Sequence, residues 1–245
     1  RGGGQLDMKT DAAGAGTRAI DGLLFDKDGT LFDFHGTWGV WAGGVIEHLS
    51  GGDAGRAADL ARAIHYDLGA RQFHDTSPAI AGTNREVAEL LAECLPGAEA
   101  GRIETYLMTS SATAPLVPVL DLVDFIAGLR ARGLRLGVMT NDAEFSARAH
   151  LAASGIGEAF DFIAGFDSGH GAKPDAAPLL AFARAEGLAP ERVAMVGDST
   201  HDLVAGRAVG MVTVAVLTGT APDAELAPYA DVVLPDIGYL PAWLD

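Results

Sequence analysis

Four short polar segments of this 245-residue chain contain the side chains that could carry out catalysis: Asp26–Thr30, Thr140–Asp142, Lys173–Pro174 and Gly197–Asp202. If the fold brings them together, they combine three acidic clusters with a threonine and a lysine. Carboxylates that are forced together lose their charge unless a cation joins them, and a hard dication with oxygen ligands meets that need. With one lysine fixed beside it, such a site suits phosphoryl transfer, in which catalysis consists mainly of positioning groups and neutralising charge.

The residue types also predict the role of each side chain in such a reaction. Asp26 ends an apolar run, and its carboxylate is the expected nucleophile that forms an acyl phosphate. Asp28 lies two residues further on, points the same way in an extended chain, and is the expected general acid and base. Thr140 and Asn141 are expected to contact the phosphoryl oxygens. Lys173 would supply a positive charge to both the nucleophile and the phosphoryl group.

A magnesium ion is the predicted cofactor, and carboxylates are its expected ligands. Asp198 would bind Mg²⁺ together with Asp26 and the backbone carbonyl of Asp28. Asp202, one turn into the next helix, would bind a metal-bound water or orient Lys173.

Several neighbouring residues also have a purely structural interpretation. Asn141 and Asp142 could cap the helix that follows them, and Ser199 and His201 could simply begin the next one. Lys27 follows the nucleophile directly, but strand alternation points its side chain away from it.

The elements that must position these residues can be read from the hydrophobic pattern. Six short apolar runs have the character of buried parallel strands: 19–25, 134–140, 160–166, 193–197, 212–216 and 231–234. Helical patterns lie between most of them, and four of these end at glycines that suit a helix C-terminus: Gly133, Gly155, Gly187 and Gly210. In one helix, Phe145, Ala149 and Ala152 form the expected buried stripe. The alternation predicts an α/β fold with a doubly wound parallel sheet, whose strands end at the polar segments.

Residues 35–112 interrupt this alternation, because their apolar positions follow helical spacing and predict no strand. We interpret them as a small helical cap domain inserted into a Rossmann-like catalytic core of residues 19–34 and 113–245. The expected linkers are 32–36 and 114–118. Within the cap, Arg71 lies between helices and is the first candidate to bind a substrate carboxylate. Trp38 and Trp41 have helical spacing and are expected in the cap's own core.

Composition restricts the class of partner. The formal net charge of −16 argues against nucleic acid, which requires clustered Lys and Arg. The single cysteine allows no intrachain disulfide, and no apolar run approaches the roughly 18 residues of a membrane helix. The default is a cytoplasmic protein, monomeric or homodimeric, that acts on a small phosphorylated metabolite. Residues 1–18 are rich in Gly, Ala and polar residues and lack the apolar core of a signal peptide, so we expect them to form a disordered leader.

The four polar segments resemble, in order and approximate spacing, the four motifs of the haloacid dehalogenase superfamily. Asp26–Leu31 is similar to its DxDGT motif with the following apolar residue, and Leu136–Asn141 to its apolar strand that ends in threonine. Lys173-Pro174 resembles the third motif, and Gly197–Asp202 the fourth, GDxxxD. The resemblance implies a Rossmann-like core, a helical cap, Mg²⁺ and an aspartyl-phosphate on Asp26. Within the family, the chain looks most like the phosphoglycolate phosphatase branch.

A phosphatase acting on phosphoglycolate or a sugar phosphate is therefore the leading prediction. Dehalogenase members need no acid at the position of Asp28, and phosphonatase members need a cap lysine, which residues 35–112 lack. A β-phosphoglucomutase-like phosphomutase stays open, although the missing cap lysine weakens it. A non-enzymatic phospho-acceptor domain is the remote alternative, because such domains are much shorter and have no cap.

Overall fold

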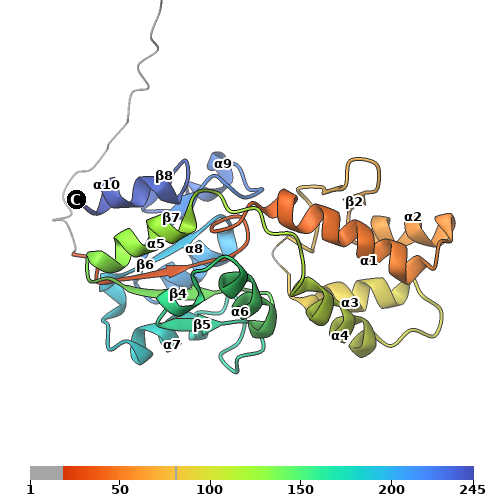
Figure 1. The fold of residues 1–245 in the computed structure, drawn as a ribbon, viewed down its shortest axis with the longest axis horizontal. Coiled ribbons are helices and arrows are strands. Elements are labelled where there is room, and N and C mark those ends of the chain that lie inside the picture. The colour runs from red at the N-terminus through yellow and green to blue at the C-terminus, as the bar shows by residue number, and fades with distance from the viewer. Residues whose placement is uncertain (1–18, 81) are drawn as a thin grey trace, which may run out of the picture.

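The chain forms a larger α/β part and a smaller, mainly helical part, joined by two linkers (Figure 1). The computed structural model describes residues 19–80 and 82–245, and the predicted leader, 1–18, lies outside them. We call the larger part the core and residues 35–112 the cap. Within the described residues, no helix combines the length and the apolar character that crossing a membrane requires.

Six parallel strands form the core sheet in the order β5-β4-β1-β6-β7-β8. Their bounds are β1 Gly22–Phe25, β4 Arg135–Met139, β5 Phe162–Ala164, β6 Val193–Gly197, β7 Val212–Val216 and β8 Val232–Leu234. Each strand lies within one of the six predicted apolar runs, which confirms the predicted fold class. Because the chain builds β4 and β5 on one side of β1 and β6 to β8 on the other, the carboxyl ends of β1, β4 and β6 meet at a topological switch point.

Helices cover both faces of the sheet, since successive strand residues point to opposite sides. Leu23 and Phe25 pack with α5 on one face, whereas Leu24 packs with Phe182 of α7 on the other. The core helices are α5 Leu122–Ala131, α6 Glu144–Ala153, α7 Ala177–Ala185, α8 Thr200–Ala208, α9 Asp223–Leu226 and α10 Leu240–Leu244, with short 3₁₀ turns at Gly157–Ala159, Pro190–Arg192 and Ile237–Tyr239. The predicted glycine stops after α5, α6, α7 and α8 all have φ between 66° and 81°, the conformation expected of a helix C-terminus.

The predicted buried stripe of α6 is wrong. Phe145 is 61% exposed, whereas His150 on the same helix is 1% exposed. Ser146 and His150 form part of the buried face instead, because this face contacts the last helix of the cap and Lys27.

The cap contains four helices and a small hairpin. Its elements are a π-helical turn at His35–Gly39, then α1 Val40–Ser50, α2 Ala54–Ala63, β2 Tyr66–Asp67, β3 Gln72–Phe73, α3 Asn84–Glu93 and α4 Ala100–Ser111. The antiparallel hairpin of β2 and β3 shows that the prediction of a cap without strands is wrong. Strands of two residues are too short to produce a recognisable alternation of apolar and polar residues in the sequence. Apolar side chains of the cap form a hydrophobic cluster separate from those of the core, and Trp38 belongs to it as predicted.

The two linkers between core and cap run side by side. Phe32 and Pro118 form an isolated antiparallel bridge, and the Asp33 N–H donates to the Val117 carbonyl over 2.7 Å. These contacts fall within the segments 32–36 and 114–118 that the sequence predicts as linkers. Both covalent connections between the two parts therefore pass through one place, next to the end of β1 (Figure 1).

Candidate active site

The switch point collects the polar residues that follow three adjacent strands. Asp26, Thr140 and Asp198 come directly after β1, β4 and β6, and Lys173 lies on the loop before α7. Six of the eight predicted site residues line one cavity: Asp26, Asp28, Thr140, Asn141, Lys173 and Asp198.

Lys173 joins two buried carboxylates. Its ammonium nitrogen lies 2.6 Å from Asp26 Oδ1 and 2.6 Å from Asp202 Oδ1. Burial alone would lower the pKa of Lys173, but the carboxylates of Asp202 and Asp26 raise it above its ordinary value, so the ammonium stays charged. The other oxygen of Asp202 accepts hydrogen bonds from the backbone N–H and the hydroxyl of Ser199, which caps α8. Of the two roles predicted for Asp202, this geometry favours the orientation of Lys173.

Asp26, Asp198 and Asp202 form a buried acidic group, in which one carboxylate oxygen of each lies within 4.8 Å of the others. Burial raises the pKa of Asp26 to about 6; Asp202 and Asp28 act in the same direction, and Lys173 opposes them. Burial, followed by Asp26 and Asp202, also raises the pKa of Asp198 well above its ordinary value. The charge of Lys173 alone is thus too small to balance three buried carboxylates. A divalent cation that prefers oxygen ligands would fit their carboxylate oxygens.

Two glycines make room for the Asp198 carboxylate. A Cβ atom added to Gly29 or to Gly219 would overlap the Asp198 carboxylate oxygens. Gly29 also has a φ of +83°, which a residue with a side chain rarely adopts. Thr30 donates from its hydroxyl to Asp198 Oδ1 over 3.2 Å, and this hydrogen bond fixes the position of one carboxylate oxygen.

Thr140 and Asn141, which follow β4, also line the cavity. Thr140 Oγ accepts the Asp142 backbone N–H over 3.1 Å, which leaves its hydroxyl proton available as a donor. The Asn141 side chain pairs with the backbone of Lys173 in both directions, donating to its carbonyl and accepting from its N–H over 2.9 Å each. Asn141 therefore ties the Lys173 loop to β4 instead of capping the helix that follows. The N-cap residue of α6 is Ala143, and no side chain caps this helix.

Lys27 is fully buried, and its ammonium group pairs with the carboxylate of Asp28. Its ammonium lies 2.8 Å from Asp28 Oδ2, 3.3 Å from Asp142 Oδ2 and 3.1 Å from His150 Nδ1. The ring of Trp38 lies 4.9 Å away, at a distance that suits a cation–π contact. Burial alone would lower the pKa of Lys27, but the carboxylates of Asp28 and Asp142 raise it, so this second buried ammonium is also charged.

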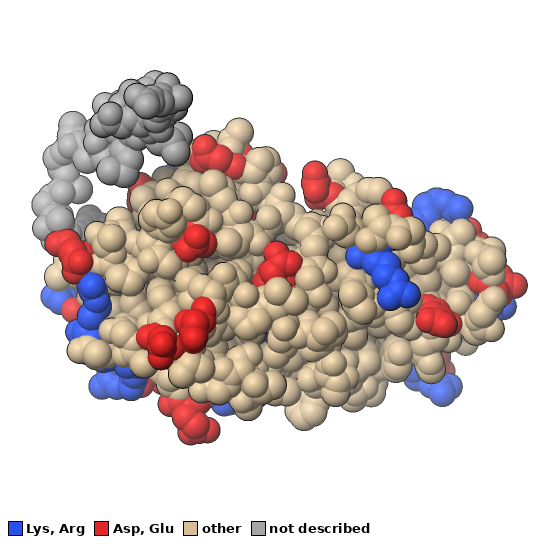
Figure 2. All heavy atoms as spheres, turned by 45° about the horizontal axis from the view of Figure 1, so that its top comes forward, with Lys and Arg blue, Asp and Glu red and all other residues tan. Residues whose placement is uncertain are grey.

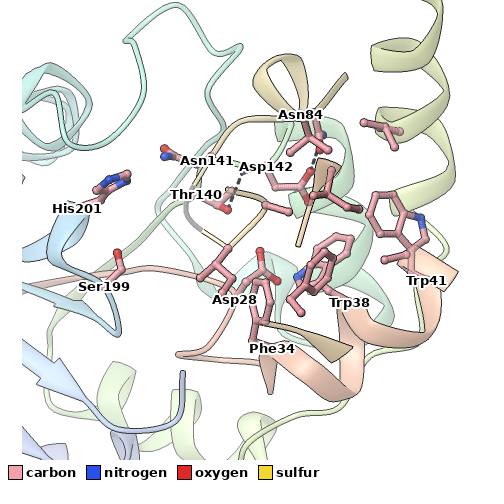
Figure 3. Close-up of a pocket in the computed structure, with 18 of the residues that line it drawn as sticks. Asp28, Phe34, Trp38, Trp41, Asn84, Thr140, Asn141, Asp142, Ser199 and His201 are labelled. Atoms are coloured by element: carbon pink, nitrogen blue, oxygen red, sulfur yellow. Dashed lines mark hydrogen bonds between the residues drawn. The ribbon is translucent and has the colours of Figure 1, made fainter. Parts of the chain in front are cut away.

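The residues around Lys27 also connect the core to the cap. An ammonium only donates hydrogen bonds, so His150 accepts at Nδ1 and donates from Nε2 to the Ser111 carbonyl at the end of α4, over 2.6 Å. Asn84 at the start of α3 donates to Asp142 Oδ1 over 3.1 Å (Figure 3). The environment of Asp28 therefore depends on contacts with both α3 and α4 of the cap.

The cavity extends from these polar residues into the cap. The cavity has a volume of about 90 Å³, which is several times the roughly 10–15 Å³ that one water molecule needs. Ser199 and His201 lie at one end of the close-up view and Trp38 and Trp41 toward the other, with Asp28, Thr140 and Asn141 between them (Figure 3). Ser199 and His201, for which the sequence favours the simple role of beginning a helix, also line the cavity.

Arg71 does not line this cavity; it borders a separate hollow beside Gly43, Ile46 and Leu68. Its placement gives no support to the prediction that it binds a substrate carboxylate. On the face of the molecule in Figure 2, acidic side chains are scattered over both parts, and Lys and Arg side chains lie mainly toward the two ends. The lysine that a substrate meets inside the cavity is Lys173.

Sequence reasoning missed the environment of Lys27, and with it His150 and Asn84. The alternation of side chains along a strand correctly predicts that Lys27 points away from Asp26. It does not predict that the long Lys27 side chain contacts the neighbouring Asp28. One signal was present: lysine is almost never fully buried unless it is paired, and Lys27 lies only two residues after the end of a strand predicted to be buried.

Comparison with known proteins identifies the family. A family model described as haloacid dehalogenase-like hydrolase matches residues 20–210. The phosphoglycolate phosphatase of Rhodospirillum rubrum is 35% identical over 119 residues, which are 49% of this chain and 49% of that protein. The enzyme of the same name from Chromobacterium violaceum is 37% identical over 117 residues, 48% of this chain and 52% of that protein. The chain thus spans about half the length of the curated relatives it matches.

Solved structures share the fold. A crystal structure of a predicted phosphoglycolate phosphatase from Haemophilus somnus 129pt has a TM-score of 0.71 at 19% identity, and the match covers 94% of this chain and 100% of that one. For a HAD phosphatase from Thermococcus onnurineus the TM-score is 0.64 at 22% identity, with 92% and 98% covered. The family model matches most of the chain, and the matched residues include all four polar segments. The chain therefore belongs to the haloacid dehalogenase-like hydrolase family.

Proposed function

We propose that the protein is a Mg²⁺-dependent phosphatase that hydrolyses small phosphate monoesters through an aspartyl-phosphate on Asp26. The observation that carries this proposal is the position of Asp26, which shares Lys173 with Asp202 and a cation-requiring acidic group with Asp198. The names of the curated relatives agree with it. The cytoplasmic location and the monomeric or dimeric state stay predictions.

In the first step, a carboxylate oxygen of Asp26 attacks phosphorus and the bond from phosphorus to the ester oxygen breaks. Asp28, on the same edge, gives a proton to that oxygen, so the alcohol leaves neutral. Lys173 and the Thr140 hydroxyl face the phosphoryl oxygens and stabilise their charge.

In the second step, Asp28 takes a proton from water, and the resulting oxygen nucleophile attacks the phosphorus of the acyl phosphate. The bond from phosphorus to Asp26 breaks, inorganic phosphate leaves, and both carboxyl groups return to their starting states. Lys27 acts through Asp28: it is a positioning residue that holds this carboxylate in one place during both proton transfers.

Mg²⁺ would be held by the carboxylates of Asp26 and Asp198 and by the backbone carbonyl of Asp28. Asp202 would orient Lys173, with which it pairs. When bound, the ion supplies positive charge that lets a dianionic ester approach a carboxylate. The cap closes the cavity on the opposite side, which keeps bulk water from the acyl phosphate.

Turnover of p-nitrophenyl phosphate and of a panel of phosphorylated metabolites, with Mg²⁺ and with EDTA, tests the proposal. We expect phosphate release that needs Mg²⁺ and is lost with EDTA. A folded protein that releases no phosphate from any ester would contradict the phosphatase assignment. Transfer of the phosphoryl group from a hexose 1-phosphate to its 6-position would favour a phosphomutase, although no cap lysine or arginine lines the cavity in the described part of the chain to hold a second phosphate.

Stability should depend on pH through Asp26 when no divalent cation is present. The pKa of Asp26 rises from 3.8 to about 6 on folding, so between these values the native state keeps a proton that the unfolded state has lost. The protonated Asp26 therefore stabilises the native state fully below pH 4, and this stabilisation is lost as pH rises through 6. The loss lowers the free energy of unfolding by roughly 3 kcal/mol. Urea unfolding in EDTA at pH 4.5 and 7 should show a larger loss for the unmodified protein than for Asp26→Asn. Equal losses in the two proteins would contradict this pKa.

Gly219→Ala should weaken Mg²⁺ binding, because the added Cβ overlaps the Asp198 carboxylate and forces it to move. Changes that displace a metal ligand in this way typically cost roughly 10- to 100-fold in metal affinity, which the Mg²⁺ dependence of turnover measures. Gly128→Ala is the matched control, since nothing lies within 4 Å of the added Cβ on α5. If both variants need the same Mg²⁺ concentration as the unmodified protein, Asp198 is not a ligand.

A further inference from the structure

The cap wall of the cavity is apolar. Apart from Gly82 and Asn84, the lining residues between positions 34 and 107 are all aliphatic or aromatic. Val45, Leu91 and Leu107 line the cavity and also belong to the hydrophobic cluster of the cap. The cavity therefore extends into the cap's own core instead of ending at its surface.

Two polar groups of this wall already have partners within the protein. The Trp41 indole N–H donates to Ser110 Oγ over 3.2 Å, and the Asn84 amide donates to Asp142. What the wall offers is ring surface: Trp38 and Trp41 meet edge to face with centroids 5.0 Å apart, and Phe34 and Phe73 lie 5.7 Å apart. Such a lining fits an aromatic ring or a branched alkyl group.

The described cap also lacks a cation for a second anionic group of a substrate. It contains no lysine, and none of its arginines lines the cavity: Arg56, Arg62, Arg71, Arg85 and Arg102. Arg85 pairs with Glu89 and Glu104, and Arg62 pairs with Asp59. A carboxylate placed against the cap wall would lose its hydration without gaining a cation, and several hydroxyl groups there would lose theirs at smaller cost.

We therefore propose that the substrates are phosphate monoesters of apolar alcohols or phenols, whose organic group enters the hollow of the cap. The inference rests on the proposed phosphatase function and narrows it. The core edge holds the phosphoryl group, and the cap wall selects the organic group by burying it. Phosphoglycolate and sugar phosphates, the substrates first suggested by the sequence, are then poor substrates.

A substrate series on the unmodified enzyme with Mg²⁺ tests this selection. Ethyl, butyl and hexyl phosphate have leaving groups of similar basicity, so differences in kcat/KM between them report burial. Each methylene that enters the cavity should raise kcat/KM about fourfold, from the usual transfer free energy of a buried methylene. Benzyl phosphate should exceed phosphoglycolate and glucose 6-phosphate by roughly 100-fold or more, the factor expected for burying a large apolar group.

The possible outcomes separate the two proposals. A flat alkyl series, or a kcat/KM for phosphoglycolate or glucose 6-phosphate that equals that for benzyl phosphate, overturns the apolar-substrate inference while the phosphatase function stands. No turnover of any ester, including p-nitrophenyl phosphate, overturns both.

A variant that fills the hollow gives a second test. Ala79 lines the cavity, and Ala79→Leu should lower the ratio of benzyl phosphate to methyl phosphate turnover by roughly tenfold, because part of the ring is excluded. Ala58→Leu places the same change on the exposed face of α2 and should leave the ratio unchanged. An unchanged ratio in folded Ala79→Leu would contradict the assignment of the hollow; if that variant does not fold, the substrate series decides alone.

Discussion

Asp26→Asn is expected to lower kcat for every phosphate ester by roughly 10⁴-fold or more, because an amide cannot attack phosphorus as a carboxylate does. The unmodified enzyme, quenched in acid during turnover of a ³²P-labelled ester, should retain label on the protein, and the variant should retain none. The substitution keeps the size of the side chain, so the sheet edge around it should persist.

Asp53→Asn is the matched control for this prediction. Asp53 caps α2 by accepting the Arg56 N–H, and asparagine caps helices equally well. This variant should retain both the kcat and the labelled protein. A kcat for Asp26→Asn within tenfold of the unmodified enzyme would rule out Asp26 as the nucleophile.

Lys27→Met is expected to reduce both activity and stability. Methionine has a similar length but no charge, so Asp28 loses the group that holds it and Asp142 becomes a buried carboxylate without a cation. Removing one partner of a buried ion pair costs about 3–5 kcal/mol of unfolding free energy. Misplacing the general acid and base should lower kcat for alkyl phosphates by roughly 100- to 1,000-fold.

The leaving group separates a positioning role from general damage. p-Nitrophenolate leaves without a proton, so Lys27→Met should keep a fast burst of p-nitrophenolate and lose only the slower steady-state hydrolysis. The double variant Lys27→Met/Asp142→Asn removes the orphaned charge and should regain stability without regaining activity. Equal loss of burst and steady state would mean that Lys27 serves the fold alone.

The core was predictable from sequence because its signals are local. A strand buried on both faces is continuously apolar, so runs such as that of β6 mark a strand with no knowledge of its neighbours. Glycines that end helices mark a conformation that other residues avoid. Strand ends in a doubly wound sheet then fix the edge at which Asp26, Thr140 and Asp198 lie together.

Features that depend on contact between distant segments could not be predicted in this way. The buried face of α6 is set by Lys27 and by the end of α4, so His150 is buried and Phe145 is exposed, opposite to their hydropathy. The hollow of the cap is a property of how four helices pack, and the apolar residues that line it have the same sequence pattern as those that fill a core. The position of Arg71 between helices favours a binding role, but Arg71 borders a different hollow, and sequence alone does not show which hollow a loop residue faces.

The pairing of the two linkers between core and cap restricts how the alcohol product can leave the cavity. In the proposed mechanism, the phosphoryl group is bonded to the core after the ester bond breaks, while the released alcohol lies against the wall of the cap. Because both crossings pass through one place beside Phe32 and Pro118, relative motion of the two parts is expected to be a swing about that short axis. Such a swing carries the alcohol off with the cap and admits the hydrolytic water through the gap it leaves, so one motion would discourage recapture of the phosphoryl group and prepare its release.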